Sequence, residues 1–287
     1  MIITNVYGGL GNQMFQYAFG KSLAYKQNKQ LLIDNSIFDQ YELRKFLLDK
    51  FNLSYAIATK DEIKQYELSN KFKRYFLRHI NSYIPFKSNY FFEKKEFCFD
   101  KEVFNSSSKY FAGYWQSFKY FSQIRELLLK EFTLVEPIDQ QNLILQNKII
   151  NNSSVSLHIR RGDYIILSKN KSGQALCPIS YYEKAIKYIG QNVENPYFFI
   201  FSDDIQWVKE NLPIQYNAEF IDINSKAPEK DLILMKNCKD NIIANSSFSW
   251  WGAWLNENPK KIVIAPKMWM NDMESSDDLI ESDWIIM

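Results

Sequence analysis

The pattern of apolar positions at the start of the chain predicts a strand, a turn, a helix and a second strand. Residues 2–7 form a short apolar run, and glycines follow it directly. Apolar side chains then recur at a spacing of four across residues 12–28, which predicts a helix. A second strand is expected over 30–33, ending at Asp34. This order is typical of one half of a nucleotide-binding α/β fold.

Residues 60–92 are rich in aromatic and basic side chains and carry two interpretations. A basic amphipathic helix could lie on an anionic membrane surface. A stripe of core residues opposite a face of solvated lysines is the commoner pattern, and both stay open. The aromatic and apolar residues are Phe72, Tyr75, Phe76, Ile80 and Tyr83, with Lys71, Lys73, Arg74, Arg78 and His79 among them.

The rest of the chain alternates between strand and helix patterns, which predicts a parallel sheet with helices on both faces. A polar run at 151–154 suggests a domain boundary, so we expect one domain over 1–152 and a second over 153–287. Further strands are expected at 110–115, 155–160, 196–201, 219–223, 241–244 and 262–265, and helices at 116–132, 138–150, 180–189 (N-cap Ser180), 204–211, 228–236 and from 245.

Composition and charge exclude some classes of protein. The 287 residues include 46% hydrophobic and 16% aromatic residues, enough for a sizeable core. The 35 basic and 33 acidic residues leave a net charge of +2, which argues against a nucleic-acid binder. Three widely spaced cysteines give no disulfide framework and favour a reducing compartment. The start of the chain does not resemble a signal peptide, so we expect a cytoplasmic protein.

Three predicted strands of the second half end in polar clusters, at 158–163, 202–204 and 245–249. Parallel strands bring their carboxyl ends to one edge of the sheet, where ligands of open α/β folds bind. Arg160 could hold phosphate oxygens in bidentate fashion, and the helix beginning near Ser246 and Ser247 could bind the same anion. The plain alternatives are a surface ion pair and an ordinary helix cap. The tryptophans beyond 248 are typical of helix packing.

The glycine turn of the first half has two interpretations. Gly8, Gly9 and Gly11 could bring backbone close to a ligand at a helix N-terminus, or form a tight turn without a ligand. It is not a dinucleotide fingerprint, because Met14 occupies the third glycine position. Asn12 and Gln13 could cap the helix or reach a sugar hydroxyl.

A metal site finds little support in the sequence. The two histidines are not spaced as ligands, and no Asp-x-Asp motif occurs. Adjacent aspartates stand only at 203–204 and 277–278. No Gly-x-Ser-x-Gly elbow or catalytic-triad pattern indicates a hydrolase. We therefore expect no metal and no cofactor, with a diphosphate neutralised by arginine and backbone dipoles.

Four motifs together resemble the α-1,2-fucosyltransferases of glycosyltransferase family 11. They are the GGLGNQMFQYA segment at 8–18, HIRRGDY at 158–164, FSDD at 201–204 and NSSFSWWG at 245–252. The motifs appear in the order expected for the family and jointly span most of the chain. The length resembles that of the bacterial members. The resemblance to the family implies a role in O-antigen or lipopolysaccharide biosynthesis.

The resemblance implies an α/β protein of the GT-B type, with two Rossmann-like domains facing across a cleft. The second domain would hold GDP-fucose, and the first would lie on the acceptor side. The implied reaction is an inverting, metal-independent transfer of L-fucose to O-2 of a terminal galactose. Partners would then be GDP-fucose and a galactose-terminated glycan. The sequence leaves peripheral membrane contact and the oligomeric state open.

The resemblance also implies roles for individual residues. Arg160 would bind the β-phosphate and stabilise the departing GDP, with support from Arg161, while Asn12 would face the cleft as a second catalytic group. Asp231 would recognise the guanine amino group, and His158 would lie beside the base. The full set expected to bind GDP-fucose is His158, Arg160, Arg161, Asp163, Ser202, Asp203, Asp231, Asn245, Ser246, Ser247 and Phe248.

An inverting transfer also needs a base for the acceptor hydroxyl. The glycine turn holds no carboxylate, and Asp34 or Asp39 would be arbitrary choices. Two other hypotheses stay open beside the leading one. The chain could be a glycosyltransferase of the same fold with another donor or linkage, or a catalytically silent module that binds a nucleotide or glycan.

Overall fold

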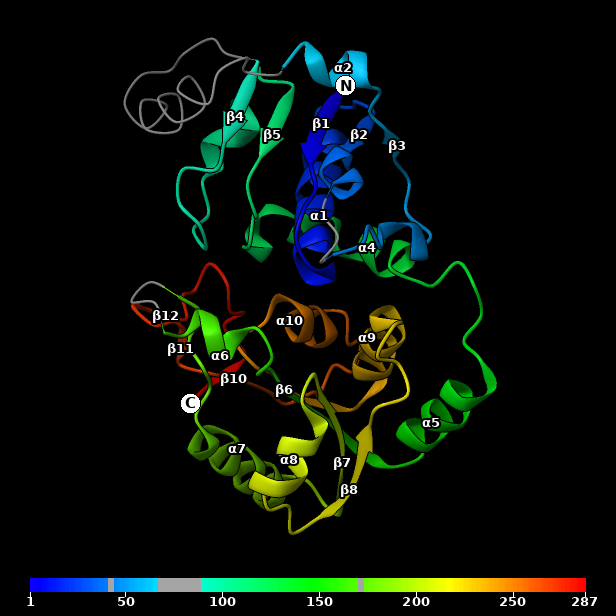
Figure 1. The fold of residues 1–287 in the computed structure, drawn as a ribbon, viewed down its shortest axis with the longest axis vertical. Coiled ribbons are helices and arrows are strands. Elements are labelled where there is room, and N and C mark those ends of the chain that lie inside the picture. Colours follow the sequence, from blue (N-terminus) through cyan, green and yellow to red (C-terminus); the bar gives the residue numbers. More distant parts are fainter. Residues whose placement is uncertain (41–43, 67–88, 170–172) are drawn as a thin grey trace. The chain divides into compact units, whose positions relative to one another are not determined.

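The computed structural model describes residues 1–40, 44–66, 89–169 and 173–287 (Figure 1). They form two compact units, Met1–Val135 and Glu136–Met287. The division lies earlier than the predicted boundary after residue 152. The reason is α5 (Gln140–Ile150), whose Leu145 and Ile149 pack with Phe199 and Phe201 of the second sheet. The helix therefore belongs to the second unit.

In the first unit, the described strands form a parallel sheet in the order β3-β2-β1-β5-β4. The long helix α1 follows β1 and has most of its side chains buried, including Phe15, Phe19 and Leu23 at the predicted spacing of four. The element bounds are β1 Ile2–Asn5, α1 Leu10–Lys26, β2 Leu31–Asp34, β3 Ala56–Ile57, α2 Lys60–Lys64, β4 Tyr90–Phe92, β5 Tyr110–Ala112 and α4 Arg125–Glu131.

The second unit carries a larger parallel sheet in the order β13-β10-β9-β6-β7-β8 among its described residues. Helices follow the strands in turn, as predicted. The bounds are β6 Ser153–Ile159, α6 Tyr164–Leu167, α7 Ile179–Asn192, β7 Pro196–Ser202, α8 Ile205–Asn211, β8 Asn217–Ile221, α9 Pro228–Asn237, β9 Asp240–Ile242, α10 Ser247–Trp254, β10 Val263–Ala265, β11 Met268–Met270, β12 Met273–Glu274 and β13 Ile285–Ile286.

The tryptophans of α10 pack as the sequence indicated. Trp250, Trp251 and Trp254 are fully buried, and their rings contact one another at centroid distances of 5.2–5.9 Å. The Trp250 indole N–H donates to the Leu279 carbonyl at 2.7 Å. The side chains therefore anchor α10 in the core, and its first turn stays at the edge of the sheet.

Some predicted elements differ from those in the structure. The strand at 110–115 ends at Ala112, because Trp115 adopts a left-handed backbone with φ 56°. The helix at 116–132 is divided into two short 3₁₀ turns (Phe118–Tyr120 and Ser122–Ile124) and α4. Ser180 is not the N-cap of α7; Pro178 takes that position, where its missing N–H has no consequence.

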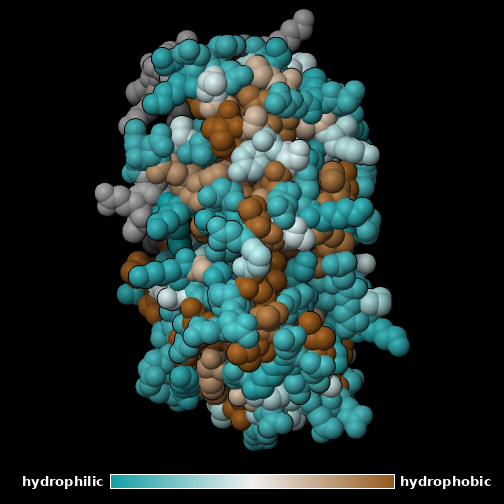
Figure 2. Space-filling model, turned by 90° about the vertical axis from the view of Figure 1, so that its right-hand side faces the viewer, coloured by the Kyte–Doolittle hydropathy of each residue, from teal (hydrophilic) through white to brown (hydrophobic). Residues whose placement is uncertain are grey.

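The aromatic and basic segment at 60–92 is described only at its two ends. Residues 67–88, including His79, lie outside the described residues, and only α2 and β4 flank them. Within the described ranges, no helix has the length and apolar character needed to cross a membrane. Hydrophilic side chains cover most of the face shown in Figure 2, with hydrophobic atoms exposed between them.

Candidate active site

Three polar clusters gather at the carboxyl edge of the second sheet, as the sequence predicted. The strands β6 and β7 pair directly from Ser153 to Ile159, and β9 pairs with the other side of β6. The segments that leave these strands therefore emerge next to one another. They carry all the residues expected to bind the donor except Asp231.

Arg160 lies at the centre of this edge and is held by two carboxylates. Its Nη1 lies 2.9 Å from Asp203 Oδ2, and its Nη2 lies 2.6 Å from Asp163 Oδ1. The guanidinium also stands 5.4 Å from the ring of Tyr164. Asp163 and Asp203 were expected to bind the donor; in this structure they contact the arginine, and a diphosphate would compete with them for it.

Arg161 is held just as firmly. Its backbone N–H donates to Asp203 Oδ1 at 2.9 Å, and its guanidinium stacks 3.4 Å above the ring of Trp207. Asp204 Oδ2 lies 3.6 Å from its Nε. Gly162 leaves room for Asp203, since a Cβ there would lie 2.3 Å from Asp203 Oδ2. Asp203 therefore links both arginines, and a side chain at position 162 would displace its carboxylate.

Ser202 and Asp204 serve the local structure. The Ser202 hydroxyl accepts the Asp204 N–H at 3.0 Å, and Asp204 Oδ1 accepts the Trp207 N–H at 3.3 Å and so caps α8. These contacts fix the loop that presents Asp203. The predicted contact of Ser202 with the donor stays a prediction.

His158 is buried at the end of β6 and carries no charge at neutral pH. Burial, with a contribution from the charge of Arg160, lowers the pKa of His158 to about 3. Its Nδ1 is buried without a hydrogen-bond partner. The imidazole lies 5.7 Å from the ring of Phe248 in the first turn of α10. The place of His158 beside the base of the donor stays a prediction.

Tyr164 links Arg160 to the start of α10. Its hydroxyl donates to the Asn245 carbonyl at 3.2 Å and interacts with the Ser246 side chain, while its ring faces Arg160. Burial raises the pKa of Tyr164, so the hydroxyl stays protonated. Ser246 is the N-cap of α10 but makes no capping hydrogen bond with its side chain, and Ser247 opens the helix. An arginine and a helix N-terminus thus share one edge, as an anion site requires.

Asn245 was expected to bind the donor, but its side chain holds backbone carbonyls within the protein. Its amide donates both hydrogens, to the Ala175 carbonyl at 2.7 Å and to the Trp269 carbonyl at 2.8 Å, while its Oδ1 lies 3.2 Å from Cys177 Sγ. The side chain is almost fully buried. It therefore holds the loop in front of α10, and its N–H groups have no capacity left for a ligand.

Asp231 lies in the first turn of α9, the helix that follows β8 and so begins at the same edge. Burial raises the pKa of Asp231 to about 6. Asn224 donates to its Oδ1 at 2.8 Å and is itself fixed by two hydrogen bonds with Asn142, at 2.7 and 2.9 Å. The sequence gave no sign of this pair of asparagines, because they are 82 positions apart.

The first unit presents its glycine turn at the carboxyl edge of its own sheet. Gly8 adopts a left-handed backbone with φ 83°, and Gly9 is the N-cap of α1, with open space where a Cβ would lie. Gly11 is buried in the first helical turn. Asn12 Oδ1 accepts a hydrogen bond of 2.8 Å from Gln116, a residue that sequence analysis missed.

Gln13 was expected to cap the helix or reach a sugar, and it does neither. It is fully buried, donates to the carbonyls of Gly8 and Lys45 at 2.9 and 2.8 Å, and accepts the Leu47 N–H at 2.9 Å. These bonds join the glycine turn to the segment after β2. Gln13 is therefore a structural residue.

Comparison with known proteins identifies the family of the chain. The sequence model of the family described as Glycosyl transferase family 11 matches residues 1–287. The chain belongs to glycosyltransferase family 11. An alpha-1,2-colitosyltransferase of Escherichia coli is 35% identical to it, across 99% of this chain and 98% of that protein. The O-antigen biosynthesis glycosyltransferase WbnK of Escherichia coli is 34% identical, across 97% of each.

A galactoside alpha-(1,2)-fucosyltransferase 2 of Rattus norvegicus is 25% identical, across 89% of this chain and 67% of that protein. Among solved structures, NodZ alpha-1,6-fucosyltransferase soaked with GDP-fucose superposes with a TM-score of 0.51 at 13% identity, across 92% and 94% of the two chains. That similarity shows the fold, and this family 11 glycosyltransferase has the GT-B fold predicted from its motifs.

The two carboxylates considered as a general base differ in their surroundings. Asp34 is almost fully buried, and its oxygens accept hydrogen bonds from the Tyr110 hydroxyl, the Asn5 side chain and the Ser36 N–H. Asp39 is exposed at the end of a 3₁₀ turn. Asp34 is thus already engaged within the protein, and neither residue is marked out as the base.

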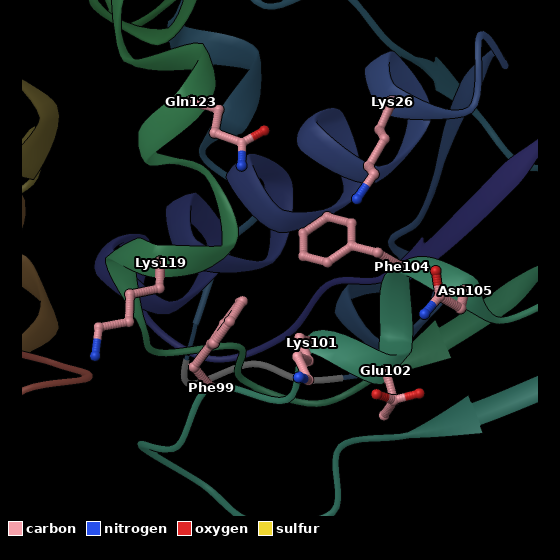
Figure 3. Close-up of a pocket in the computed structure, with 8 residues that line it drawn as sticks. All are labelled: Lys26, Phe99, Lys101, Glu102, Phe104, Asn105, Lys119 and Gln123. Carbon is pink, nitrogen blue, oxygen red and sulfur yellow. The ribbon is translucent and has the colours of Figure 1, made fainter.

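A hollow of about 420 Å³ lies elsewhere in the first unit and includes none of the predicted site residues (Figure 3). Lys26, at the far end of α1 from the glycine turn, places its ammonium 4.5 Å above the ring of Phe104. Lys119 points away from this pair in Figure 3, so the cationic side chains do not converge on one point. No group of three or more His, Cys, Asp or Glu residues in the described ranges could hold a metal ion.

Proposed function

We propose that this glycosyltransferase moves L-fucose from GDP-fucose to O-2 of a terminal galactose in a bacterial glycan such as an O-antigen. The observation that carries the proposal is the position of Arg160, at the end of β6 and linked through Tyr164 to the N-terminus of α10. The reaction would take place in the cytoplasm, where nucleotide sugars are made.

The proposed mechanism follows from the charge that develops during transfer. The sugar becomes cationic as its bond to the diphosphate breaks, and negative charge grows on the β-phosphate. Arg160 and the first-turn N–H groups of α10 would stabilise that charge without reorganisation. Asp203 fixes the direction of the Arg160 guanidinium before the donor arrives. The chain's own cationic groups would do this work, with no metal or cofactor.

Asp231 would read the base of the donor. Guanine presents an N1–H and an amino group on one edge, and a carboxylate can accept both hydrogen bonds. Asn224 donates to Asp231 Oδ1 and not to Oδ2, and this hydrogen bond fixes the orientation of the carboxylate. His158 and Phe248 would flank the base or the diphosphate from β6 and α10.

A second donor has specific support. The Escherichia coli relative at 35% identity is named an alpha-1,2-colitosyltransferase, and colitose is fucose without its 3-hydroxyl. GDP-colitose is therefore the competing donor for the same site. A hydrophobic group facing the sugar at that carbon would favour colitose, whereas a hydrogen-bonding group would favour fucose.

The test gives the protein lactose with either GDP-fucose or GDP-colitose, with and without EDTA. Turnover is measured as GDP release and by the mass of the product. A fucosylated product that persists in EDTA supports the proposal, and preference for GDP-colitose moves the assignment to that donor. Binding of GDP without turnover of either donor or any acceptor favours a catalytically silent module.

Arg160→Ala and Arg160→Lys should separate charge from geometry in the same assay. Loss of the guanidinium is expected to lower kcat by about 100-fold or more, in keeping with the loss of one charge-stabilising donor. Lysine keeps the charge but cannot bridge Asp163 and Asp203, so it should restore only a small part. Wild-type turnover by a folded Arg160→Ala protein would contradict the role.

A further inference from the structure

We propose that the outer face of α5 is an interface through which two copies of this chain form a weak dimer about a two-fold axis. This surface consists of six exposed residues of the helix and its C-cap, Gln140, Leu143, Ile144, Asn147, Ile150 and Asn151. The inference does not depend on the donor, the acceptor or the proposed reaction.

The outer face lies opposite the side of α5 that packs on the second sheet. Its members recur at intervals of three and four positions, the spacing that brings side chains to one side of a helix. Leu145 and Ile149 point the other way and belong to the core. Leu143, Ile144 and Ile150, by contrast, expose 39%, 58% and 55% of their surface. Figure 2 shows the side on which α5 lies in Figure 1, and hydrophobic atoms reach the surface in its lower half. The helix therefore has apolar side chains on a second side, which stays exposed among the described residues.

The outer face also lacks charged side chains. On α7, another surface helix of the second unit, the exposed side includes Glu183, Lys184 and Lys187. Charged residues make up 24% of the chain, and a helix face that stays in water normally carries them. They are depleted from the centre of protein interfaces, where an unpaired charge would lose its water. The composition of the outer face is therefore that of an interface and differs from that of a solvated helix.

The charged groups beside the outer face are paired within the unit. Asp139, the N-cap of α5, binds Lys230 of α9 at 2.7 Å. Lys148, the one charged residue within α5, pairs with Glu219 of β8. These ion pairs neutralise the edges of the surface, so a second copy of the chain would meet no uncompensated charge from this helix.

A surface of this kind is complementary to itself. In a two-fold contact each surface meets its own copy, so a charge near the axis would meet its like. The three amide side chains of the outer face both donate and accept hydrogen bonds, and can therefore pair with the same amides of the other copy. Its three aliphatic side chains can pack on one another in the same way. A second copy thus satisfies every group of the surface, whereas a charged partner would leave its own charges unpaired.

The size of the helix limits the strength of the contact. Its 11 residues span about 16 Å, so two crossing copies bury less than the ~800 Å² per partner of a standard interface. We therefore expect a dissociation constant of about 10–100 µM. An antiparallel crossing places the middle of each helix near the axis, which is where Ile144 stands.

The experiment is sedimentation equilibrium of the full chain over concentrations from about 1 to 500 µM, which span the expected dissociation constant. Wild type should pass from monomer to dimer across this range. Ile144→Lys and Ile144→Glu each bring like charges together at the axis and should raise the dissociation constant by about tenfold or more. An equal mixture of the two variants should recover dimers, because lysine then meets glutamate. Ile166→Lys is the matched control, since Ile166 is 71% exposed on α6 and its replacement should leave the dimer unchanged.

Three results would overturn the inference. A wild-type chain that stays monomeric over the whole range would leave the outer face to a different partner. A dimer that persists in both charged variants, or that is lost in Ile166→Lys, would assign the contact to another surface. A mixture that stays as monomeric as its components would exclude the two-fold contact. Circular dichroism checks that each variant folds, and the same pair of substitutions at Asn147, an exposed polar position of the same face, replaces any variant at 144 that does not.

Discussion

Arg160 and Asp203 form the contact on which the donor edge depends, with Nη1 and Oδ2 2.9 Å apart. The same carboxylate accepts the Arg161 N–H, and it lies where a side chain on Gly162 would otherwise stand. Two successive arginines and a glycine thus share one aspartate from the neighbouring strand. The contact orients the guanidinium before any phosphate binds, which is the form of preorganisation that lowers a transition-state barrier.

Two different substitutions should therefore produce the same kinetic defect. Asp203→Asn weakens the ion pair with Arg160. Gly162→Ala displaces the Asp203 carboxylate without changing any charge. Gly162 has no positive φ, so the clash with Asp203 is the only strain that alanine introduces there. Each should lower kcat by about tenfold or more while the protein keeps its Tm within a few degrees. Asp222→Asn, at an exposed position, is the control for loss of one charge. A normal kcat in Gly162→Ala would show that Asp203 does not position Arg160.

Asp163 should behave in the opposite way. It is the more exposed of the two carboxylates on Arg160, at 38% against 24%, and it occupies the Nη2 atom that a diphosphate oxygen would take. Asp163→Asn removes a competing anion, so GDP affinity should rise by about threefold to tenfold. Titration calorimetry with GDP measures this directly. Weaker GDP binding by a folded Asp163→Asn protein would mean that Asp163 positions the arginine instead of competing for it.

The pH dependence of donor binding should report Asp231. Burial raises the pKa of Asp231 to about 6; the charge of Glu229 adds to the rise, and the N–H of Asn224 opposes it. Because the ionised form accepts the guanine hydrogens, affinity should fall about tenfold between pH 7 and pH 5. GDP-fucose is the suitable ligand, since its diphosphate is a diester and does not titrate in that range.

Asp231→Asn is the control for that profile. It should lower affinity at pH 7 by about tenfold or more and make the remaining binding nearly independent of pH. His158 cannot account for a transition near pH 6, because its pKa lies at about 3. An unaltered pH profile in Asp231→Asn would place the titrating group elsewhere.

Local sequence was enough to predict most of the longer strands, a parallel sheet in the second unit and the gathering of three polar clusters at one edge of it. Apolar runs that end in polar clusters indicate both a strand and its carboxyl end, so the sequence alone places Arg160, Asp203 and Ser246 at one edge. The sequence does not show which of these side chains contact one another. Nothing local indicates that Asp203 serves both arginines, or that Gly162 exists to admit it.

Contacts between distant segments account for the errors. The strand predicted to reach Trp115 ends early because Glu93, 22 residues away, stabilises a left-handed turn. Gln13 was expected to reach a ligand because nothing near it in the sequence shows that its amide binds the backbone of Lys45 and Leu47, which lie in another loop. The division between the two units lies before α5, because this helix buries its apolar face on the second sheet. The sequence of α5 alone does not show which sheet the helix packs against.

Asn245 gives the clearest test of a structural role against a binding role. Asn245→Asp keeps the shape but removes both N–H donors, leaving the buried carbonyls of Ala175 and Trp269 unpaired and burying a charge near Cys177. Two unpaired carbonyls alone should cost about 2–6 kcal/mol of unfolding free energy. Thermal unfolding should therefore shift down by several degrees, and the shift should shrink as pH falls and the aspartate becomes protonated. A stable Asn245→Asp protein with a raised donor KM would instead assign the side chain to the donor.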